Sequence, residues 1–219
     1  MIVRDGEGSR WFGLYPAIVT KVVDPENLGR IEVKLPWLGE SADADVRAWA
    51  TLLTPYAGDD QGFEFLPEPD TQVVVGFEAG DLRRPYIVGA CWNGREALPE
   101  SPTTANDKRL IKTRSGSLLE FDDGAAGAKV TVSTPAGHEL VLDDVASSIT
   151  LRHSNGSSIV INAAGQVTVT ANATVEVHAS AVNVHAPVAI FDGLVQCQTL
   201  VASSGVVSPA YTPGAGNVW

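Results

Sequence analysis

Charged residues are almost absent from the last third of this 219-residue chain. Across residues 153–219 only Glu176 and Asp192 carry a charge. The segment 167–190 reads VTVTANATVEVHASAVNVHAPVAI, in which valines alternate with Ala, Ser, Thr and Asn. These short alternating runs contain too few bulky side chains to build an ordinary hydrophobic core. The segment is therefore expected to fold only by stacking on copies of itself. We therefore expect an elongated β-solenoid stem here.

Other absences exclude whole classes of protein. Cys91 and Cys197 are the only cysteines and lie far apart in the chain, so we expect unremarkable free thiols and no disulfide scaffold. The N-terminus, MIVRDGEGSRWFG, lacks the apolar core of a signal peptide, and no run of 18 apolar residues occurs, so we expect synthesis in the cytoplasm without a signal peptide. A net charge of −11 argues against binding to nucleic acid or to an anionic membrane surface.

The first half of the chain has the pattern of a small all-β domain. β-Branched and apolar runs separated by Gly and Pro predict five strands, over residues 17–24, 30–38, 46–58, 73–77 and 86–92. Ile31, Val33 and Leu35 alternate with charged residues and are core candidates, as are Trp49 and Leu52. Five short strands in this order suggest a Greek-key barrel of the oligonucleotide/oligosaccharide-binding (OB) type.

A single-strand-binding OB barrel needs a basic groove with aromatic residues. Over residues 1–109, however, acidic residues outnumber basic ones 18 to 11. We therefore expect this barrel to be a structural adaptor that binds no nucleic acid.

An ordered set of motifs in this barrel carries a family resemblance. The motifs are YPAIVT (15–20), Asp24-Pro25, GRIEV (29–33), LPW (35–37), RAWA (47–50), the loop 62–67, VVVGF (73–77) with Gly80-Asp81, and RPYIVG (84–89). In this order they resemble the OB domain of phage baseplate spike proteins (the baseplate assembly protein V family) and of the VgrG proteins of type VI secretion.

The second half contains an internal repeat. Three copies of a phrase, Gly, two variable residues, apolar-x-apolar and an Asx turn, occupy residues 116–123, 137–144 and 156–163. Alternation indicates strands with one buried face, and the Gly and Asx positions indicate reversals. The resemblance implies that this region forms an intertwined triple-stranded β-helix, a prism in which three chains wind around one axis.

The stem valines give a second reason to expect a trimer. Small β-branched side chains fill a narrow axis when three copies meet, whereas a lone chain would leave the whole row in water. The expected axial residues are Val167, Val169, Val175, Val177, Val182, Val184, Val188 and Ile190.

These patterns divide the chain into five predicted parts. They are an N-terminal arm (1–13), an OB domain (14–95), a linker (96–107), a triple-stranded β-helix stem (108–207) and a C-terminal tail or cap (208–219).

Candidate chemistry is sparse. The resemblance suggests one metal site to consider, because some spikes of the family close their tip with a His-x-His motif that binds iron. His178 and His185 lie seven residues apart, alternation points both outward, and no later His exists, so we expect no tip iron. His138 and His153 lack a partner pattern, and we assign no cofactor.

No enzyme is expected. The pairs Asp122-Asp123 and Asp143-Asp144 recur at the same place in the repeated phrase, which favours turn residues over an acid/base pair. Some related spikes carry a lysozyme domain between barrel and stem, but here residues 93–108 are a bare linker. No nucleophile elbow or P-loop motif occurs.

The resemblance implies the central, cell-puncturing spike of a contractile-tail baseplate, in a virion or a similar contractile particle, which pierces the bacterial outer envelope. Because only about 13 residues precede the barrel, we expect a separate tail hub protein. The alternative is a β-helical tailspike that binds a receptor or glycan. The apex is closed either by the tail, with Tyr211 and Trp219 as cap candidates, or by a separate tip protein of PAAR or similar type, which we favour.

Overall fold

The chain folds into strands and loops with almost no helix. The structure, a computed structural model, describes residues 10–39 and 45–208. Its helical elements are two single 3₁₀ turns, η1 (Pro36–Leu38) and η2 (Glu78–Gly80). The predicted all-β class is therefore confirmed. Within the described ranges, no helix has the length and apolar character needed to cross a membrane.

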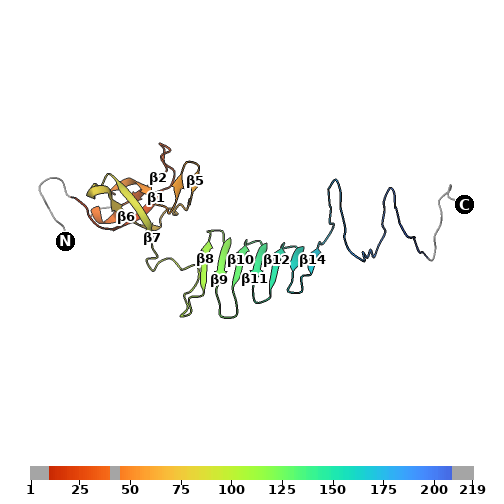
Figure 1. Cartoon of the computed structure of the whole chain (residues 1–219). Coiled ribbons are helices and arrows are strands. Elements are labelled where there is room, and N and C mark those ends of the chain that lie inside the picture. The colour runs from red at the N-terminus through yellow and green to blue at the C-terminus, as the bar shows by residue number, and fades with distance from the viewer. Residues whose placement is uncertain (1–9, 40–44, 209–219) are drawn as a thin grey trace.

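The N-terminal domain is a closed five-stranded barrel (Figure 1). Its strands are β1 (Tyr15–Lys21), β2 (Arg30–Lys34), β3 (Arg47–Leu52), β6 (Gln72–Phe77) and β7 (Pro85–Ala90). They close in the order β1-β2-β3-β7-β6, with β3 and β7 parallel and the other pairs antiparallel. The predicted barrel is thus confirmed. A small hairpin, β4 (Ala57–Gly58) and β5 (Gln61–Gly62), projects from the connection between β3 and β6.

Small and β-branched side chains fill the barrel. The buried apolar residues are Ala17, Val19, Ile31, Val33, Leu35, Ala50, Val73, Val75 and Ile87. Ile31, Val33 and Leu35 lie in the core as predicted. The expectation for Trp49 is wrong, because the fully buried Ala50 points inward and strand alternation turns its neighbour outward. The Trp49 ring instead packs against the Arg30 side chain, whose guanidinium carbon lies 5.8 Å from the centroid of the ring.

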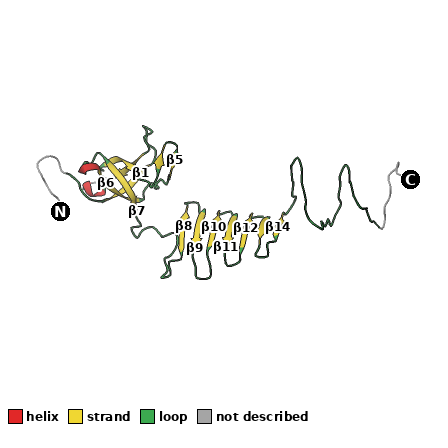
Figure 2. Ribbon diagram, viewed as in Figure 1, coloured by secondary structure: helices red, strands yellow, loops and turns green. Residues whose placement is uncertain are grey.

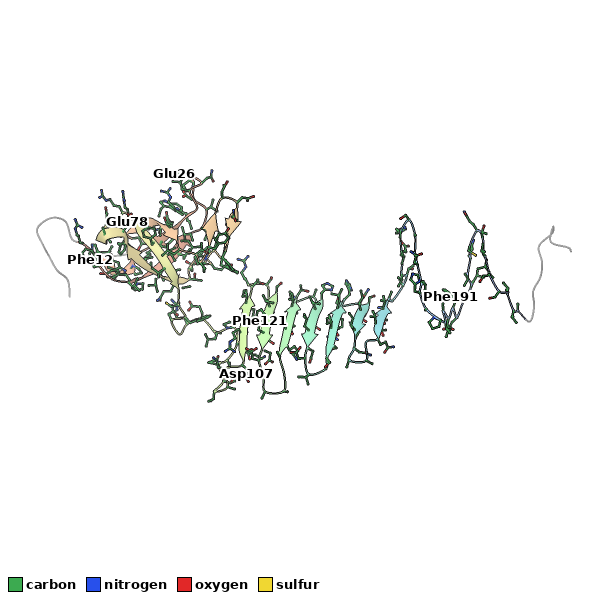
Figure 3. The ribbon with its side chains drawn as sticks, in the orientation of Figure 1. Phe12, Glu26, Glu78, Asp107, Phe121 and Phe191 are labelled. Atoms are coloured by element: carbon green, nitrogen blue, oxygen red, sulfur yellow. The ribbon has the colours of Figure 1, made fainter. Side chains whose placement is uncertain are left out.

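One end of the barrel is closed by packed aromatic rings. The Tyr15 and Trp37 rings stack with centroids 4.6 Å apart, and Trp11 lies 4.8 Å from Trp37. Gly80 allows the chain to close here, since its φ is +79° and a Cβ would lie 2.9 Å from the Trp11 amide nitrogen. Phe12 and Glu78 mark this end, which points away from the second domain (Figure 3).

The second domain is a seven-stranded antiparallel sheet that runs in strict chain order. Its strands lie side by side across the long axis of the molecule (Figure 1). They are β8 (Lys108–Lys112), β9 (Leu118–Asp122), β10 (Lys129–Ser133), β11 (Glu139–Asp143), β12 (Ser148–Arg152), β13 (Ser158–Ile161) and β14 (Val167–Thr170). The three repeated phrases are β9, β11 and β13, each with its preceding turn.

The same four-residue turn leads into β9, β11, β13 and β14. In each turn the fourth residue is a glycine whose N–H donates to the carbonyl of the first residue, with an N–O distance of 2.9 Å. The glycines are Gly116, Gly137, Gly156 and Gly165, with φ of +93°, +87°, +93° and +73°. Only glycine adopts this backbone without strain, which explains why it opens each phrase.

After β14 the chain continues without strands. Residues 171–208 form a long extended zigzag, drawn entirely as loop in Figure 2. The sequence predicted brief strands as far as residue 190, and this is not observed in the single chain. A strand needs a neighbour for its N–H and C=O groups, and residues 173–207 form no strand pairing with any described part of the chain.

A buried ion pair fixes the connection between β1 and β2. The Asp24 side chain, 2% exposed, accepts hydrogen bonds from Arg30 Nε at 2.7 Å and Nη2 at 3.0 Å, and from the N–H groups of residues 26, 28 and 30. The pKa of Asp24 lies well below its ordinary value, chiefly because the Arg30 side chain donates hydrogen bonds to the carboxylate. Burial opposes this effect. The Asp24-Pro25 motif therefore has a structural role, because Asp24 fixes the connection between β1 and β2.

We predict that Asp24→Asn lowers the melting temperature of the barrel at pH 7. Because the pKa of Asp24 is depressed in the folded chain, its stabilising effect is present above the unfolded value of about 3.9 and is lost as the pH falls below it. The difference in melting temperature between variant and unsubstituted protein should narrow below about pH 4. Thermal melts from pH 7 to pH 2.5 test this, with Glu26→Gln, the exposed second partner of Arg30, as the control. A difference in melting temperature between Asp24→Asn and the unsubstituted protein that stayed constant from pH 7 to pH 2.5 would contradict the depressed pKa of Asp24.

Candidate functional site

One face of the seven-stranded sheet is a continuous apolar surface. The strand register aligns two residues of each strand, separated by one residue, so that they form two parallel rows along the sheet. We call this surface the apolar face. It consists of Ile111, Leu119, Phe121, Val130, Val132, Leu140, Leu142, Ile149, Leu151, Ile159, Ile161, Val167 and Val169.

The opposite face of the sheet is mostly polar. Thr131, Thr150 and Thr168 occupy the central positions of β10, β12 and β14 there. Ion pairs link neighbouring strands on this side: Lys108 to Glu120 at 3.4 Å, and Glu139 to Arg152. This contrast is the pattern of an antiparallel sheet with one solvated face and one buried face.

Nothing in the described part of the chain covers the apolar face. Apart from Leu119 and Val130, each of its side chains is 37–61% exposed. Phe121, labelled in Figure 3, lies on the apolar face near the end of the sheet that adjoins the barrel. Soluble monomers rarely expose contiguous apolar patches larger than a few hundred Å². The apolar face is therefore the candidate functional site, with the character of a candidate protein–protein interface.

The structure brings only two of the predicted axial residues onto the apolar face. Val167 and Val169 on β14 pair with Ile161 and Ile159 and continue both rows. The other six, Val175, Val177, Val182, Val184, Val188 and Ile190, lie in the zigzag and are 61–80% exposed. Their position on a trimer axis remains a prediction. Tyr211 and Trp219, the predicted cap residues, lie outside the described residues.

The sequence analysis missed most of the apolar face. It recognised β9, β11 and β13 by their leading glycine but did not name β8, β10 and β12, which lack that glycine. The signal was present, since KVTVS (129–133) and SITLR (148–152) have the same apolar-x-apolar core as the named phrases. Antiparallel pairing then places these residues beside the recognised ones.

The Asp pairs of the repeated phrases and the stem histidines have local hydrogen-bond or ion-pair partners. Asp122 Oδ1 accepts the Gly124 N–H at 3.0 Å and Asp143 Oδ1 accepts the Ala146 N–H at 2.8 Å, so both serve their turns as predicted. His178 Nε2 lies 3.3 Å from the Glu176 carboxylate on the exposed zigzag. Among the residues that the structure describes, no three His, Cys, Asp or Glu side chains are grouped to hold a metal ion.

His138 and His153 lie together, which the sequence did not indicate. Their ring centroids are 4.3 Å apart across β11 and β12. Each Nδ1 accepts a backbone N–H, from Ser154 at 3.3 Å and from Asn155 at 3.1 Å. Each ring thus uses its Nδ1 to hold a turn beside it.

Comparisons with known proteins match two separate parts of the chain. Residues 15–92 match the family of the type VI secretion system/phage-baseplate injector OB domain. Residues 129–188 match the phage baseplate V C-terminal trimerisation domain. The first match covers the barrel, and the second begins at β10 and extends into the zigzag.

Curated relatives include spike proteins of type VI secretion systems. VgrG3 of Vibrio cholerae is 24% identical over 111 residues, which is 48% of this chain and 11% of that protein. VgrG5 and VgrG1a of Pseudomonas aeruginosa are 26% and 28% identical over 112 and 92 residues, each covering 14% of the relative. The match thus spans only a small part of each relative's length. The chain thus carries a phage-baseplate injector OB domain followed by a phage baseplate V trimerisation domain, and it is similar to VgrG spike proteins over about half of its length.

Proposed function

We propose that this protein is the central cell-puncturing spike of a contractile-tail baseplate. The observation that carries the proposal is the apolar face, an uncovered surface in the region that matches a trimerisation domain. Three copies of the sheet, each with its apolar face turned inward, form a three-sided prism that covers all three faces. The barrels sit at one end of this prism and the zigzags extend from the other.

Burial of the apolar face supplies the energy for this assembly. Full burial of a Val, Leu or Ile side chain contributes about 1.5–3 kcal/mol, and roughly half of that remains to be gained for side chains that are half-exposed. Over thirteen residues the gain is on the order of 10 kcal/mol per chain. Folding of the stem and formation of the trimer are then one event.

The zigzag fits the same proposal. Its six valine and isoleucine side chains are exposed, and residues 173–207 form no strand pairing within the single chain; two further copies supply neighbours for both. Val175, Val177, Val182, Val184, Val188 and Ile190 then lie on or near the common axis, and neighbouring chains provide the strand pairing that one chain lacks.

The alternative of a receptor- or glycan-binding tailspike has less support. Sugar-binding surfaces use aromatic and carboxylate side chains, whereas residues 153–207 offer only Phe191, Glu176 and Asp192. The same scarcity favours a spike without enzymatic activity. We further propose that the barrels seat the trimer on a separate hub protein and that the zigzag end carries a PAAR-type or similar tip protein, in place of an iron-bound tip.

We predict that Ile149→Asp abolishes the trimer while Thr150→Asp preserves it. The two residues are neighbours on β12 and face opposite sides of the sheet, so the same charge is buried in one variant and solvated in the other. Native mass spectrometry of both variants tests this. A folded monomer of the unsubstituted protein, or a trimer of the Ile149 variant, would refute the proposed assembly.

A second substitution tests the zigzag separately. Val177→Asp places three carboxylates near the axis without counter-charges, each unpaired buried charge costing about 3–5 kcal/mol. The melting temperature of the trimer should fall by roughly 10 °C or more. His178→Asp, at the adjacent position that strand alternation turns outward, reports the cost of a charge in this region. An unchanged melting temperature for Val177→Asp would show that its side chain does not face the axis.

A truncation tests how the apex is closed. Deletion of residues 208–219 should leave a trimeric stem but reduce the recovery of a tip protein with assembled particles, because the strand ends alone form an incomplete seat. Quantitative mass spectrometry of purified particles measures this ratio, and metal analysis of the trimer accompanies it. Stoichiometric iron that disappears with His185→Ala would overturn the account of a tip without metal.

A further inference from the structure

Two histidines meet at one edge of the stem sheet. β11 and β12 are neighbours in the sheet, and their register, continued by one residue, places His138 opposite His153 (Figure 1). The two rings are tilted by 47° and their centroids are 4.3 Å apart. Strand alternation puts both rings on the side of the sheet that carries Leu140 and Leu151. These two residues, here named the histidine pair, therefore border the apolar face.

Each ring holds a turn through an unprotonated nitrogen. His138 Nδ1 accepts the Ser154 N–H at 3.3 Å, and this hydrogen bond joins two neighbouring turns. His153 Nδ1 accepts the Asn155 N–H at 3.1 Å inside its own turn. Only the neutral ring makes these bonds, because a protonated imidazole is a donor at both nitrogens. Both contacts therefore stabilise the stem at neutral pH and are lost when the rings take up a proton.

Two other turns of the same type are held by side chains that do not titrate. Asn162 Oδ1 accepts the N–H groups of Ala164 and Gln166, at 3.1 and 3.0 Å. Thr113 Oγ1 accepts the Ser117 N–H at 3.1 Å. The turn itself thus needs an acceptor and not a histidine. What the histidine pair adds is a response to protons, since histidine changes its charge between about pH 5 and pH 8.

The charges around the histidine pair do not favour protonated rings. Three segments that meet at this edge contain no Asp, Glu, Lys or Arg; they are residues 134–138, 153–157 and 171–175. Glu139 and Arg152, the next residues on β11 and β12, form an ion pair with each other. Lys129 and Asp143 lie opposite one another at the far ends of β10 and β11, and Arg114 in the neighbouring turn is already ion-paired. Protonation of both rings therefore places two like charges side by side, which disfavours the charged form.

We propose that the histidine pair is an acid-sensitive switch in the stem. At neutral pH both rings are uncharged and hold the two turns together. As the pH falls from about 7 to about 5, each Nδ1 takes a proton from solvent, both hydrogen bonds are lost and the rings repel each other. In the proposed trimer three such pairs border the buried apolar faces, so acid weakens the assembly there. Only this last consequence rests on the proposed trimer, because the histidine pair forms within one chain.

Thermal melts of the stem at about pH 7.5 and about pH 5 test the switch. The melting temperature of the unsubstituted protein should fall by roughly 5 °C on acidification. The double variant His138→Gln, His153→Asn carries the neutral side chains found at the equivalent positions of the turn 162–166, and should lose most of this fall. The matched control His178→Gln, His185→Gln removes two histidines from the zigzag and should retain it. An equal fall in the first variant, or none in the unsubstituted protein, overturns the switch.

Amide hydrogen exchange tests the switch without any substitution. Protection of the Ser154 and Asn155 N–H groups, corrected for the intrinsic effect of pH on exchange, should drop roughly tenfold between the same two pH values. The Ala164 N–H is the matched control, because it occupies the position of Asn155 in a turn whose acceptor is Asn162 Oδ1. Unchanged protection of Ser154 and Asn155, or an equal loss at Ala164, overturns the switch.

The native mass of the unsubstituted protein at about pH 7.5 separates this proposal from the trimer. A monomer overturns the trimer, while the exchange of Ser154 and Asn155 still decides on the histidine pair. A trimer whose Ser154 and Asn155 amides do not respond to acid overturns the switch alone.

Discussion

The burial of one apolar face is the constraint on which the rest of this structure depends. The sheet β8–β14 is one layer thick, so it has no second layer of its own to cover the thirteen residues of that face. A domain ordinarily pairs two layers around a core. Here the second layer has to come from outside the chain, and the match to a trimerisation domain identifies further copies as its source. By contrast, the barrel buries its own core and needs no such help.

The sequence was sufficient for the parts of the fold that depend on local pattern. Alternation in RIEVK, Gly and Pro at the reversals, and the ordered motifs predicted the barrel, and the leading glycines predicted the turns before β9, β11 and β13. Trp49 was misplaced because size and hydrophobicity alone do not reveal which side of a strand faces inward; its small neighbour Ala50 takes that position.

Contacts between distant segments could not be read from the chain in the same way. The contact between the tilted His138 and His153 rings depends on the register between β11 and β12, and the salt bridge from Arg114 to Glu68 joins residues 46 positions apart. The apolar face itself follows from register, since only the pairing of β10 with β9 and β11 aligns its valines with the leucines on either side. These relations arise from the pairing of whole strands and leave no signature in a single motif.

The glycine turns at one edge of the sheet have a consequence for how needles of this type differ in length. Gly116, Gly137 and Gly156 recur after every second strand, and neighbouring turns along that edge hydrogen-bond to one another, as the Ser154 N–H does to His138 Nδ1. Removing or duplicating one such unit restores both the strand direction and the inward face, whereas a single added strand reverses the chain. Neighbouring strands lie about 4.8 Å apart, so the stem grows or shrinks in steps of roughly 10 Å. Genetic insertion of whole units would thus lengthen the stem without redesigning either end.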